Sequence, residues 1–244
     1  MKTDQFKKDL EELQITVTDV QFEQFVTYYE LLIEKNKVMN LTTITEFDEV
    51  MKKHFIDSLS LTKVLDLNGV FSVIDVGTGA GFPGIPLKIA FPGLRVTLLD
   101  SLQKRVGFLR EVINELGLTE TEAVHGRAED FAKPDQMRES FDLCVSRAVA
   151  NLSVLSEYCL PYVKVGGKFI SYKSDKVSME IEGNKTEMEQ AEHAISVLGG
   201  RLKEQNEFML PFSDIYRNLV VIEKCRPTPK QYPRKAGTAS KKPL

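Results

Sequence analysis

The stretch DVGTGAGFPG, residues 75–84, decides the fold of this 244-residue chain. It follows the apolar run FSVI and precedes the apolar segment IPLKIAF, so it joins an expected strand to an expected helix. Its glycines stand at alternate positions, 77, 79 and 81. Glycine permits a tight turn and a close approach of ligand to backbone, because it has no Cβ. The stretch therefore predicts a ligand-binding turn between a strand and a helix.

The spacing of these glycines argues against a phosphate ligand. A dinucleotide-binding turn has a further glycine at the sixth position counted from Gly77, where Phe82 stands. A P-loop ends in Lys followed by Ser or Thr, which this stretch lacks. The pattern Asp75-x-Gly77-x-Gly79-x-Gly81 instead looks like the first motif of Rossmann-like S-adenosylmethionine-dependent methyltransferases. That cofactor has no phosphate, and Asp75 can orient its amino-acid end through hydrogen bonds or water.

From residue 70 onward, strand-like runs alternate with helical stretches. The expected strands cover residues 71–76, 95–100, 121–126, 141–146, 168–173, 201–210 and 218–224. The expected helices cover residues 84–91, 102–116, 129–139, 151–163 and 177–198. Repeated strand–helix–strand units predict a parallel sheet with helices on both faces. Since the last two runs can pair antiparallel, we expect an α/β, Rossmann-like methyltransferase fold with a mostly parallel seven-stranded sheet and one antiparallel edge strand.

The residues before this pattern are expected to form a helical extension. Apolar side chains from Phe22 to Ile33 recur at helical spacing, and Thr18 with Gln21 matches a capping box. The segment DLNG at 66–69 is a plausible joint. We therefore divide the chain into an N-terminal helical subdomain (1–68), a methyltransferase domain (69–225) and a basic C-terminal tail (226–244).

Two further acids fall at the ends of the next two strands. Asp100 ends the second strand, 23 residues after Gly77, where an acid binds ribose hydroxyls in folds of this kind. Glu129, beside Ala128, follows the third strand, where the adenine is expected. Taken singly, Asp100 could cap the following helix and Glu129 could be a solvated loop acid. Together with the glycine turn, the two acids predict a pocket for S-adenosylmethionine.

The composition indicates neither a membrane span, nor a secretory leader, nor a metal site. No stretch approaches the roughly 18 unbroken apolar residues of a membrane helix, and the first residues lack the apolar segment of a signal peptide. Cys144, Cys159 and Cys225 are too few and too scattered for a disulfide framework or a zinc site. His125 and His193 have no partner at metal-ligand spacing. We expect a cytoplasmic protein without a metal.

The net charge of −3 hides a basic C-terminus. Residues 224–244 contain seven Lys and Arg side chains and no acid. A basic segment on a mildly acidic protein is typical of proteins that bind a polyanion, and the Pro and Gly content of this one indicates a flexible tail. The alternative is a solvated terminus without a partner.

The methyl acceptor is suggested by what the sequence lacks. Attack on C5 of a pyrimidine uses a cysteine, usually after proline, and none of the three cysteines follows a proline. Methylation of an exocyclic amine commonly uses an Asp/Asn-Pro-Pro-Tyr/Phe motif after the fourth strand, where CVSRAVANL stands instead. Guanine N7 carries a lone pair in the ring plane and no proton, so it needs only alignment with the methyl group. The sequence is consistent with an N7 acceptor.

The chain also resembles one family closely. The segments DVGTGAGFPGIPLKI, LLDSLQKRVGFL, GRAED and SRAVANLSVL and the ending YPRKAGTASKKPL are similar to those of the small-subunit ribosomal RNA methyltransferase G family, also called glucose-inhibited division protein B. NKVMNLTTI and HFIDSL extend the resemblance over nearly the whole chain, although Ala239 replaces an expected proline. The resemblance implies methyl transfer from S-adenosylmethionine to guanine N7 in small-subunit (16S) ribosomal RNA, naked or in a ribonucleoprotein particle.

The resemblance also implies site residues by position. It assigns to the cofactor pocket Gly77, Phe82, Asp100, Ser101, Leu102, Ala128, Glu129 and Arg147. Arg147 ends the fourth strand, where the acceptor enters, and its guanidinium can bond the O6/N7 edge of guanine or a phosphate. The alternative for Arg147 is a surface ion pair. Lys173 is the next candidate for RNA contact, whereas His54 and Asp57 are expected to brace the N-terminal helices.

Two other functions stay open at this point. A methyltransferase of the same fold that acts on a small molecule or a protein would share the pocket but has little use for the basic tail. Deleting residues 226–244 would then leave its turnover unchanged. A non-enzymatic module would bind S-adenosylmethionine without transferring its methyl group. The modified guanine and the oligomeric state are not indicated by the sequence.

Overall fold

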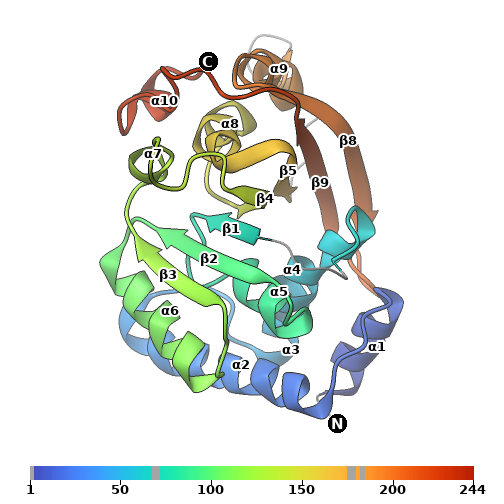
Figure 1. The fold of residues 1–244 in the computed structure, drawn as a ribbon. Coiled ribbons are helices and arrows are strands. Elements are labelled where there is room, and N and C mark those ends of the chain that lie inside the picture. Colours follow the sequence, from blue (N-terminus) through green and yellow to red (C-terminus); the bar gives the residue numbers. More distant parts are fainter. Residues whose placement is uncertain (1–2, 68–71, 175–179, 182–184) are drawn as a thin grey trace.

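The computed structural model describes residues 3–67, 72–174, 180–181 and 185–244. Its main sheet has seven strands in the order β3-β2-β1-β4-β5-β9-β8 (Figure 1). All seven predicted strands are present: β1 (Ser72–Val76), β2 (Arg95–Asp100), β3 (Thr121–His125), β4 (Phe141–Arg147), β5 (Val163–Lys173), β8 (Gly200–Met209) and β9 (Tyr216–Lys224).

The direction of the strands confirms the predicted fold class. The five strands from β3 to β5 run parallel, whereas β9 runs antiparallel to both of its neighbours, β5 and β8. The reversed strand therefore lies one position in from the edge, and the edge strand β8 makes an antiparallel pairing. Strand order reverses at β1, which pairs with β2 on one side and β4 on the other. In open α/β sheets, ligands bind at this reversal, beyond the carboxyl ends of the strands.

Helices cover both faces of the sheet and divide the core in two. In Figure 1, one face carries α2 (Asp19–Met39), α5 (Gly84–Ala90) and α6 (Gln103–Glu115), and the other carries α8 (Leu152–Cys159) and α9 (Glu187–Val197). Successive residues of a strand point to opposite faces. Within β1, Val73 accordingly packs into the core beneath α2 and α5, and Ile74 packs into the core beneath α8 and α9.

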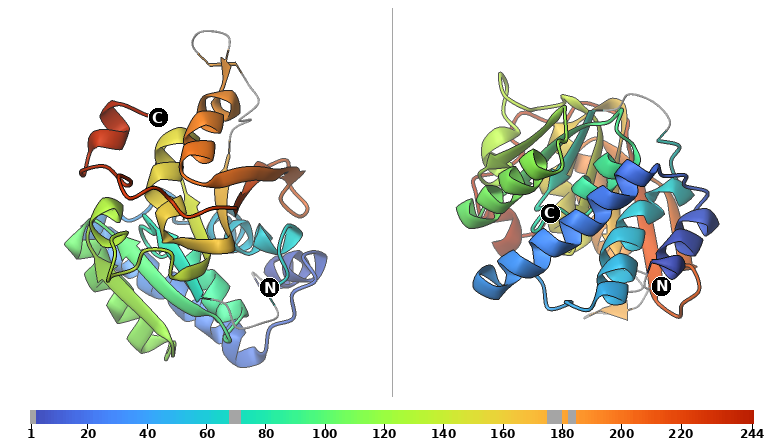
Figure 2. Two further views of the ribbon diagram at one scale, coloured as in Figure 1. Left: turned by 45° about the horizontal axis from the view of Figure 1, so that its top comes forward. Right: turned by 90° about the horizontal axis from the view of Figure 1, so that it is seen from below.

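The N-terminal helices share the first of these cores with the sheet. The segment before β1 forms α1 (Asp4–Glu12), α2, α3 (Phe47–Val50), η1 (Met51–Ile56), α4 (Asp57–Leu59) and η2 (Ser60–Lys63). In the right-hand view of Figure 2, which shows the molecule from below, these helices lie across the sheet. The predicted capping box is confirmed, because the Thr18 hydroxyl accepts from Gln21 N and the Gln21 side chain accepts from Thr18 N. The boundary predicted at residues 68 and 69 lies outside the described residues.

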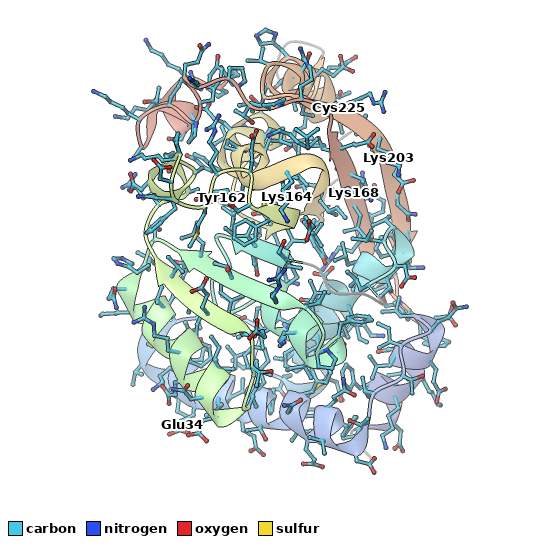
Figure 3. All side chains as sticks on the ribbon, in the orientation of Figure 1. Glu34, Tyr162, Lys164, Lys168, Lys203 and Cys225 are labelled. Carbon is cyan, nitrogen blue, oxygen red and sulfur yellow. The ribbon has the colours of Figure 1, made fainter. Side chains whose placement is uncertain are left out.

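The edge of the sheet formed by β8 is polar. β8 alternates exposed and half-buried side chains along most of its length, and Lys203 lies on this edge strand (Figure 3). Charged side chains on an edge strand discourage pairing with another chain.

Two predicted helices differ from the structure. The helix expected over 177–198 begins only at residue 187, where Thr186 and Glu189 form a capping box. Before it, β6 (Glu180–Ile181) pairs antiparallel with β7 (Lys185–Thr186), and the rest of 175–184 lies outside the described residues. The helix expected over 129–139 is reduced to α7 (Ala128–Phe131). Polar periodicity alone did not reveal these boundaries, because short hairpins and turns share that composition.

The prediction that residues 226–244 form a flexible tail is wrong. The segment follows the surface from β9 to a short helix, α10 (Thr238–Lys241), which packs near α8 (Figures 1 and 2). One of its basic side chains, Arg234, is engaged in an ion pair with Glu157, and Lys224, at the end of β9 just before the segment, pairs with Glu139. Charge composition could not reveal this packing, because the acids that hold the segment lie far away in the sequence.

Candidate cofactor and acceptor site

The glycine turn is bonded to the end of the neighbouring strand. Gly77 N and Thr78 N both donate to the Leu99 carbonyl, at 2.8 and 3.2 Å. Gly79 N donates to Asp100 Oδ2 at 2.9 Å. Gly77, Gly79 and Gly81 all have positive φ, which L side chains rarely adopt. The turn after β1 and the acid after β2, predicted as two parts of one pocket, are therefore in direct contact.

Asp75 lies beneath this turn and shapes it. Its Oδ2 accepts from the Thr78 hydroxyl at 2.6 Å and from Gly84 N at 2.8 Å. The carboxyl group is fully buried and its Oδ1 has no hydrogen-bond partner among the described residues. Burial raises the pKa of Asp75 to about 6, against the two hydrogen bonds that lower it. Direct contact between Asp75 and the cofactor stays a prediction.

Gly79 leaves open space where a cofactor can approach. A Cβ added at Gly79 meets no atom within 4 Å, whereas one at Gly77 would lie 2.5 Å from Val149 Cγ2. One at Gly81 would meet Ile85 and the Tyr28 hydroxyl. The open face at Gly79, with the Asp100 carboxylate next to it, fits a ligand that must touch backbone and bond its hydroxyls to an acid.

Asp100 does not cap the helix that follows it. Its Oδ1 accepts from Leu102 N at 2.8 Å, but α6 begins after Leu102, whose side chain makes no cap hydrogen bond. Asp100 is buried, whereas Ser101 and Leu102 are exposed at the rim. Asp100 thus joins the glycine turn to the start of the next segment, and its contact with a ribose stays a prediction.

Glu129 lies in α7, close to the end of β3. It is buried, and its Oε1 accepts from Gly237 N at 2.8 Å. The adjacent Ala128 carbonyl accepts from the Tyr162 hydroxyl at 2.6 Å. The prediction of a solvated loop acid is therefore wrong for Glu129, and its proposed contact with adenine stays a prediction.

Arg147 lies on an aromatic platform at the end of β4. Its guanidinium carbon is 5.1 Å from the centre of the Phe82 ring, and the His54 ring stacks on Phe82 at 4.5 Å with an interplanar angle of 16°. Burial and the nearby Arg147 charge lower the pKa of His54 to about 3. A neutral His54 can accept weakly from Arg147 through Nδ1, at 3.5 Å, while its Nε2 bonds the Thr42 hydroxyl at 2.8 Å.

Each predicted acceptor-side cation is paired with an acid. Asp57 binds two arginines, since its Oδ2 lies 2.8 Å from Arg147 Nη1 and its Oδ1 lies 2.7 Å from Arg217 Nε. Lys173 Nζ lies 2.5 Å from Glu187 Oε1. The ion pair weighed as an alternative for Arg147 is thus present, but it is buried beside the turn rather than at the surface. Asp57 braces the N-terminal helices as expected, and it also fixes the direction of Arg147.

These side chains line a cavity of about 710 Å³ at the ends of β4 and β5. The cavity combines the basic residues Lys53, Arg147, Lys173 and Arg217 with the acids Asp57 and Glu187, so positive charge is in excess. Sequence reasoning missed Arg217. Because β9 is antiparallel to β5, its first residues come to the same edge as the last residues of β5, and that pairing was the available signal.

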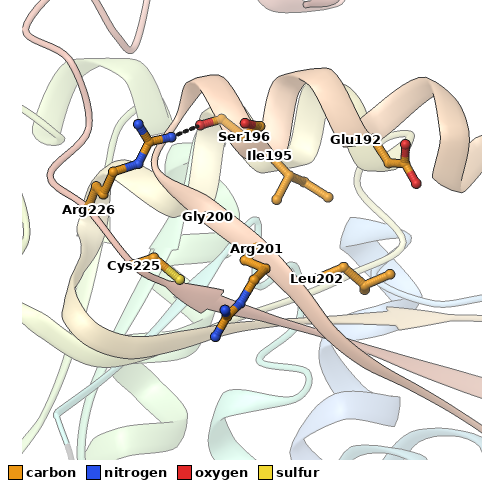
Figure 4. A pocket seen from close by; sticks show the side chains of 8 residues that line it. All are labelled: Glu192, Ile195, Ser196, Gly200, Arg201, Leu202, Cys225 and Arg226. Carbon is orange, nitrogen blue, oxygen red and sulfur yellow. Dashed lines mark hydrogen bonds between the residues drawn. The ribbon is translucent and has the colours of Figure 1, made fainter.

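A second cavity, of about 460 Å³, lies between α9 and the edge strand β8 (Figure 4). Its residues include Cys225 and Arg226, and Arg226 bonds the Ser196 carbonyl at 3.0 Å. None of the predicted site residues lines this cavity. In the part of the chain that the structure describes, no cluster of His, Cys, Asp or Glu suits a metal ion, and no helix is long and apolar enough to cross a membrane.

The fold and the site together define a class. A parallel sheet with a glycine turn after β1, an acid after β2 and another after β3 is that of the Rossmann-like S-adenosylmethionine-dependent methyltransferases. The chain belongs to the rRNA small subunit methyltransferase G family, whose model matches residues 21–208. The resemblance found in the sequence is therefore confirmed.

Similar proteins span the whole chain. The ribosomal RNA small subunit methyltransferase G of Alkaliphilus metalliredigens is 54% identical over 238 residues, which cover 98% of this chain and 97% of that protein. The Bacillus cereus protein of the same name is 52% identical over 244 residues, covering 100% and 99%.

Solved structures share the fold at lower identity. A SAM-dependent methyltransferase from Aquifex aeolicus has a TM-score of 0.52 and 18% identity, over 75% of this chain and 96% of that one. A variant of MtNAS in complex with S-adenosylmethionine has a TM-score of 0.54 and 17% identity, over 85% and 77%. These two likenesses concern the fold alone.

Proposed function

We propose that this protein transfers a methyl group from S-adenosylmethionine to N7 of a guanine in small-subunit (16S) ribosomal RNA, in the cytoplasm. The observation that carries the proposal is the basic cavity beside the glycine turn, in a chain of this family. Arg147 lines this cavity and lies over the Phe82 ring of the glycine turn, which supports a role for it on the acceptor side of the expected cofactor pocket. A nucleotide whose phosphate is attracted by Lys53, Lys173 and Arg217 can present its base there.

The chemistry asks little of the protein beyond alignment. S-adenosylmethionine supplies an electrophilic methyl group, and Gly79, Asp100 and Glu129 are the residues that would hold it. Guanine N7 attacks through an in-plane lone pair, so no base is required. Arg147 can hold the guanine edge through a planar guanidinium, which lies over the Phe82 ring and pairs with Asp57 through Nη1. His54 is neutral at physiological pH, so it does not repel Arg147.

The test is incubation with methyl-labelled S-adenosylmethionine and either deproteinised 16S RNA or assembled small subunits. Nucleoside analysis should recover the label as 7-methylguanosine, and the better of the two substrates shows whether a ribonucleoprotein particle is preferred. Label in another nucleoside, or none in either substrate, would contradict the proposal.

Arg147 variants test alignment within this reaction. Arg147→Ala should lower the single-turnover rate at saturating RNA by on the order of 100-fold, because a misplaced acceptor costs about that much. Arg147→Lys should recover little, although it keeps a charge beside Asp57, because an ammonium lacks the planar two-pronged geometry. Arg201→Ala, at the distant sheet edge, is the control. A wild-type rate for Arg147→Lys would contradict alignment by the guanidinium.

Variants that remove charge, rather than a deletion, distinguish an RNA substrate from a small-molecule or protein substrate. Deleting 226–244 no longer serves, because this segment is packed onto the fold and bonded to Glu129. Four of its lysines are exposed and can be changed to Gln without removing the segment: Lys230, Lys235, Lys241 and Lys242. For an RNA substrate, the log–log salt slope of binding should fall by up to about 0.7–0.9 per lost phosphate contact. Unchanged methylation and an unchanged slope would favour the other substrates.

A further inference from the structure

The C-terminal segment reaches the carboxylate that we assign to adenine. Gly237 N donates to Glu129 Oε1 at 2.8 Å, across 108 residues of sequence. We propose that residues 226–244, which we name the C-terminal strap, position Glu129 and so complete the adenine side of the cofactor pocket. This inference rests on the proposed function and adds Gly237 to it as a positioning residue.

The strap is fixed before it reaches Glu129. The Arg138 guanidinium donates to the Tyr232 carbonyl at 2.7 Å and to the Thr228 carbonyl at 2.6 Å. Arg234 then donates three hydrogen bonds to the Glu157 carboxylate, from its backbone N at 2.8 Å, from its Nε at 2.9 Å and from its Nη2 at 2.5 Å. Because Glu157 is almost fully buried in α8, this ion pair holds the strap at Arg234, shortly before Gly237.

The strap is also fixed after Gly237. The Ala239 side chain is buried, and the Ser153 hydroxyl donates to the Leu244 carbonyl at 3.1 Å. Gly237 itself has a φ of +78° and precedes the first residue of α10. A left-handed residue between two anchored segments turns its N–H toward α7 rather than along α10, and glycine takes this conformation without strain.

Glu129 needs such support because α7 is short. Only residues 128–131 are helical, so few backbone hydrogen bonds of its own hold this segment. Tyr162 holds the Ala128 carbonyl from the sheet side, and Gly237 holds the Glu129 carboxylate from the strap side. A carboxylate fixed through Oε1 keeps Oε2 in a constant direction, where it can accept from the amino group of adenine.

The test compares two ligands that differ at that amino group and at the adjacent ring nitrogen N1, which carries a proton only when a carbonyl replaces the amino group. Calorimetry gives the affinity for S-adenosylhomocysteine and for S-inosylhomocysteine, in which a carbonyl oxygen replaces the amino group. The wild-type chain should prefer the adenosyl ligand. A chain ending at Ala236 should bind the adenosyl ligand about threefold to tenfold more weakly, as expected for a misdirected charged acceptor, and should bind the inosyl ligand nearly as before.

A second variant guards against poor folding of the shortened chain. Gly237→Ala keeps every anchor but strains the backbone, and its Cβ would meet only Arg127 Nη1, at 3.9 Å. Gly166→Ala is the matched control, because Gly166 has a φ of +89° with no atom within 4 Å of an added Cβ. Only Gly237→Ala should lower the preference for the adenosyl ligand. In a Glu129→Ala background, neither strap change should reduce affinity further.

The outcomes separate this inference from the proposed function. A wild-type chain that binds neither ligand contradicts the proposed function itself. A wild-type chain that binds S-adenosylhomocysteine, with an adenosyl preference that survives both strap changes, overturns the inference alone. The inference is also overturned if strap changes weaken both ligands equally, or weaken binding just as much when Glu129 is already Ala.

Discussion

Gly77, Gly79 and Gly81 belong to one turn but meet different surroundings. At Gly77 the space above Cα is taken by Val149, and at Gly81 it is taken by Ile85 and Tyr28. Only Gly79 faces open space, next to Asp100. Two of the three glycines therefore serve packing of the turn within the protein, and the third is the one at which we predict that a side chain would meet the cofactor.

Gly79→Ala should abolish or strongly weaken S-adenosylmethionine binding, because its methyl group would occupy the open face. The change also strains the backbone by about 1–2 kcal/mol, since φ is +64°. Gly117→Ala carries the same strain, at φ +61° and with no atom within 4 Å of the new Cβ, at the end of α6. Calorimetry should show a loss for Gly79→Ala alone. Equal affinities in the two variants would remove Gly79 from the pocket.

His54 should make the folded state sensitive to acid. Its folded pKa, about 3, lies below the unfolded value of 6.5, so on acidification the unfolded chain takes the proton first. Stability contributed by neutral His54 is therefore lost as pH falls from about 6.5 toward 3. From pH 7.5 to pH 5, the wild type should lose about 1–2 kcal/mol more than His54→Gln.

Urea unfolding of both proteins at the two pH values measures this difference. Asp75 has the opposite sign, because its raised folded pKa of about 6 makes the fold bind a proton that the unfolded chain releases. Asp75 is present in both proteins, so its effect cancels in the comparison. Parallel losses in the wild type and His54→Gln would show that His54 does not titrate differently in the folded state.

At the scale of residues, the sequence indicated that Asp100 lies near the glycine turn, which the structure shows, but it did not indicate how the acceptor-side cations are paired. Asp100 and Glu129 could be predicted because each follows an apolar strand at the edge where ligands bind. The linkage of Asp57 to both Arg147 and Arg217 could not be predicted, because it joins η1 and α4 to two non-consecutive strands. Such contacts depend on tertiary packing, which local spacing does not encode.

At the scale of elements, α2 supports the methyltransferase sheet through side chains that bond backbone carbonyls. Gln21 Nε2 donates to Ile89 O and Ala90 O at the end of α5, and Gln24 Nε2 donates to Leu116 O after α6. The last carbonyls of a helix lack partners within it. One long helix thus satisfies the ends of two others and keeps them in register with the sheet.

Tyr28 extends this support to the glycine turn, where its hydroxyl donates to the Ala80 carbonyl at 2.5 Å. Burial raises the pKa of Tyr28 well above its usual value, so the hydroxyl remains a donor. Tyr28→Phe should lower the free energy of unfolding by about 1–3 kcal/mol, because a buried carbonyl loses its partner. It should also weaken S-adenosylmethionine binding.

Tyr29→Phe is the control for Tyr28→Phe, on the next residue of the same helix. Its hydroxyl also donates to a backbone carbonyl, that of Thr45, but at 3.2 Å and exposed to solvent. Thermal unfolding and calorimetry should separate the two variants. If both behave alike, α2 does not stabilise the turn through this hydrogen bond.

Element type was predictable wherever apolar periodicity is strong. Six of the seven strands and the helices after β1 and β2 lie within a residue or two of their predicted ranges, and β5 begins five residues before its predicted start. Prediction failed at residues 180–181 and 185–186, where polar residues leave no apolar stripe to mark the start of the helix. The division of the chain at residues 68 and 225 stays a prediction.

At the scale of the whole molecule, two ion pairs of the same chemistry differ in burial. Side chains of Arg234 and Glu157 are 24% and 1% exposed, whereas those of Arg201 and Glu223 are 72% and 33% exposed. Arg234→Leu should destabilise the protein by about 3–5 kcal/mol, because it leaves the Glu157 charge buried and unpaired. Arg201→Ala should leave the free energy of unfolding almost unchanged, because water solvates the remaining partner. Urea unfolding of both variants measures these losses. Similar losses in the free energy of unfolding for Arg234→Leu and Arg201→Ala would show that the strap is only loosely attached.

Because a chain is synthesised from its N-terminus, an inner position of the main sheet is filled last. β9 is the last strand in the sequence, yet it lies between β5 and β8. β8 has no neighbour in the main sheet until residues 216–224 have left the ribosome, and the residues that reach Glu129 follow later still. The main sheet is therefore completed by its last-made strand, which enters between two strands made before it, and the contact with Glu129 can form only after that.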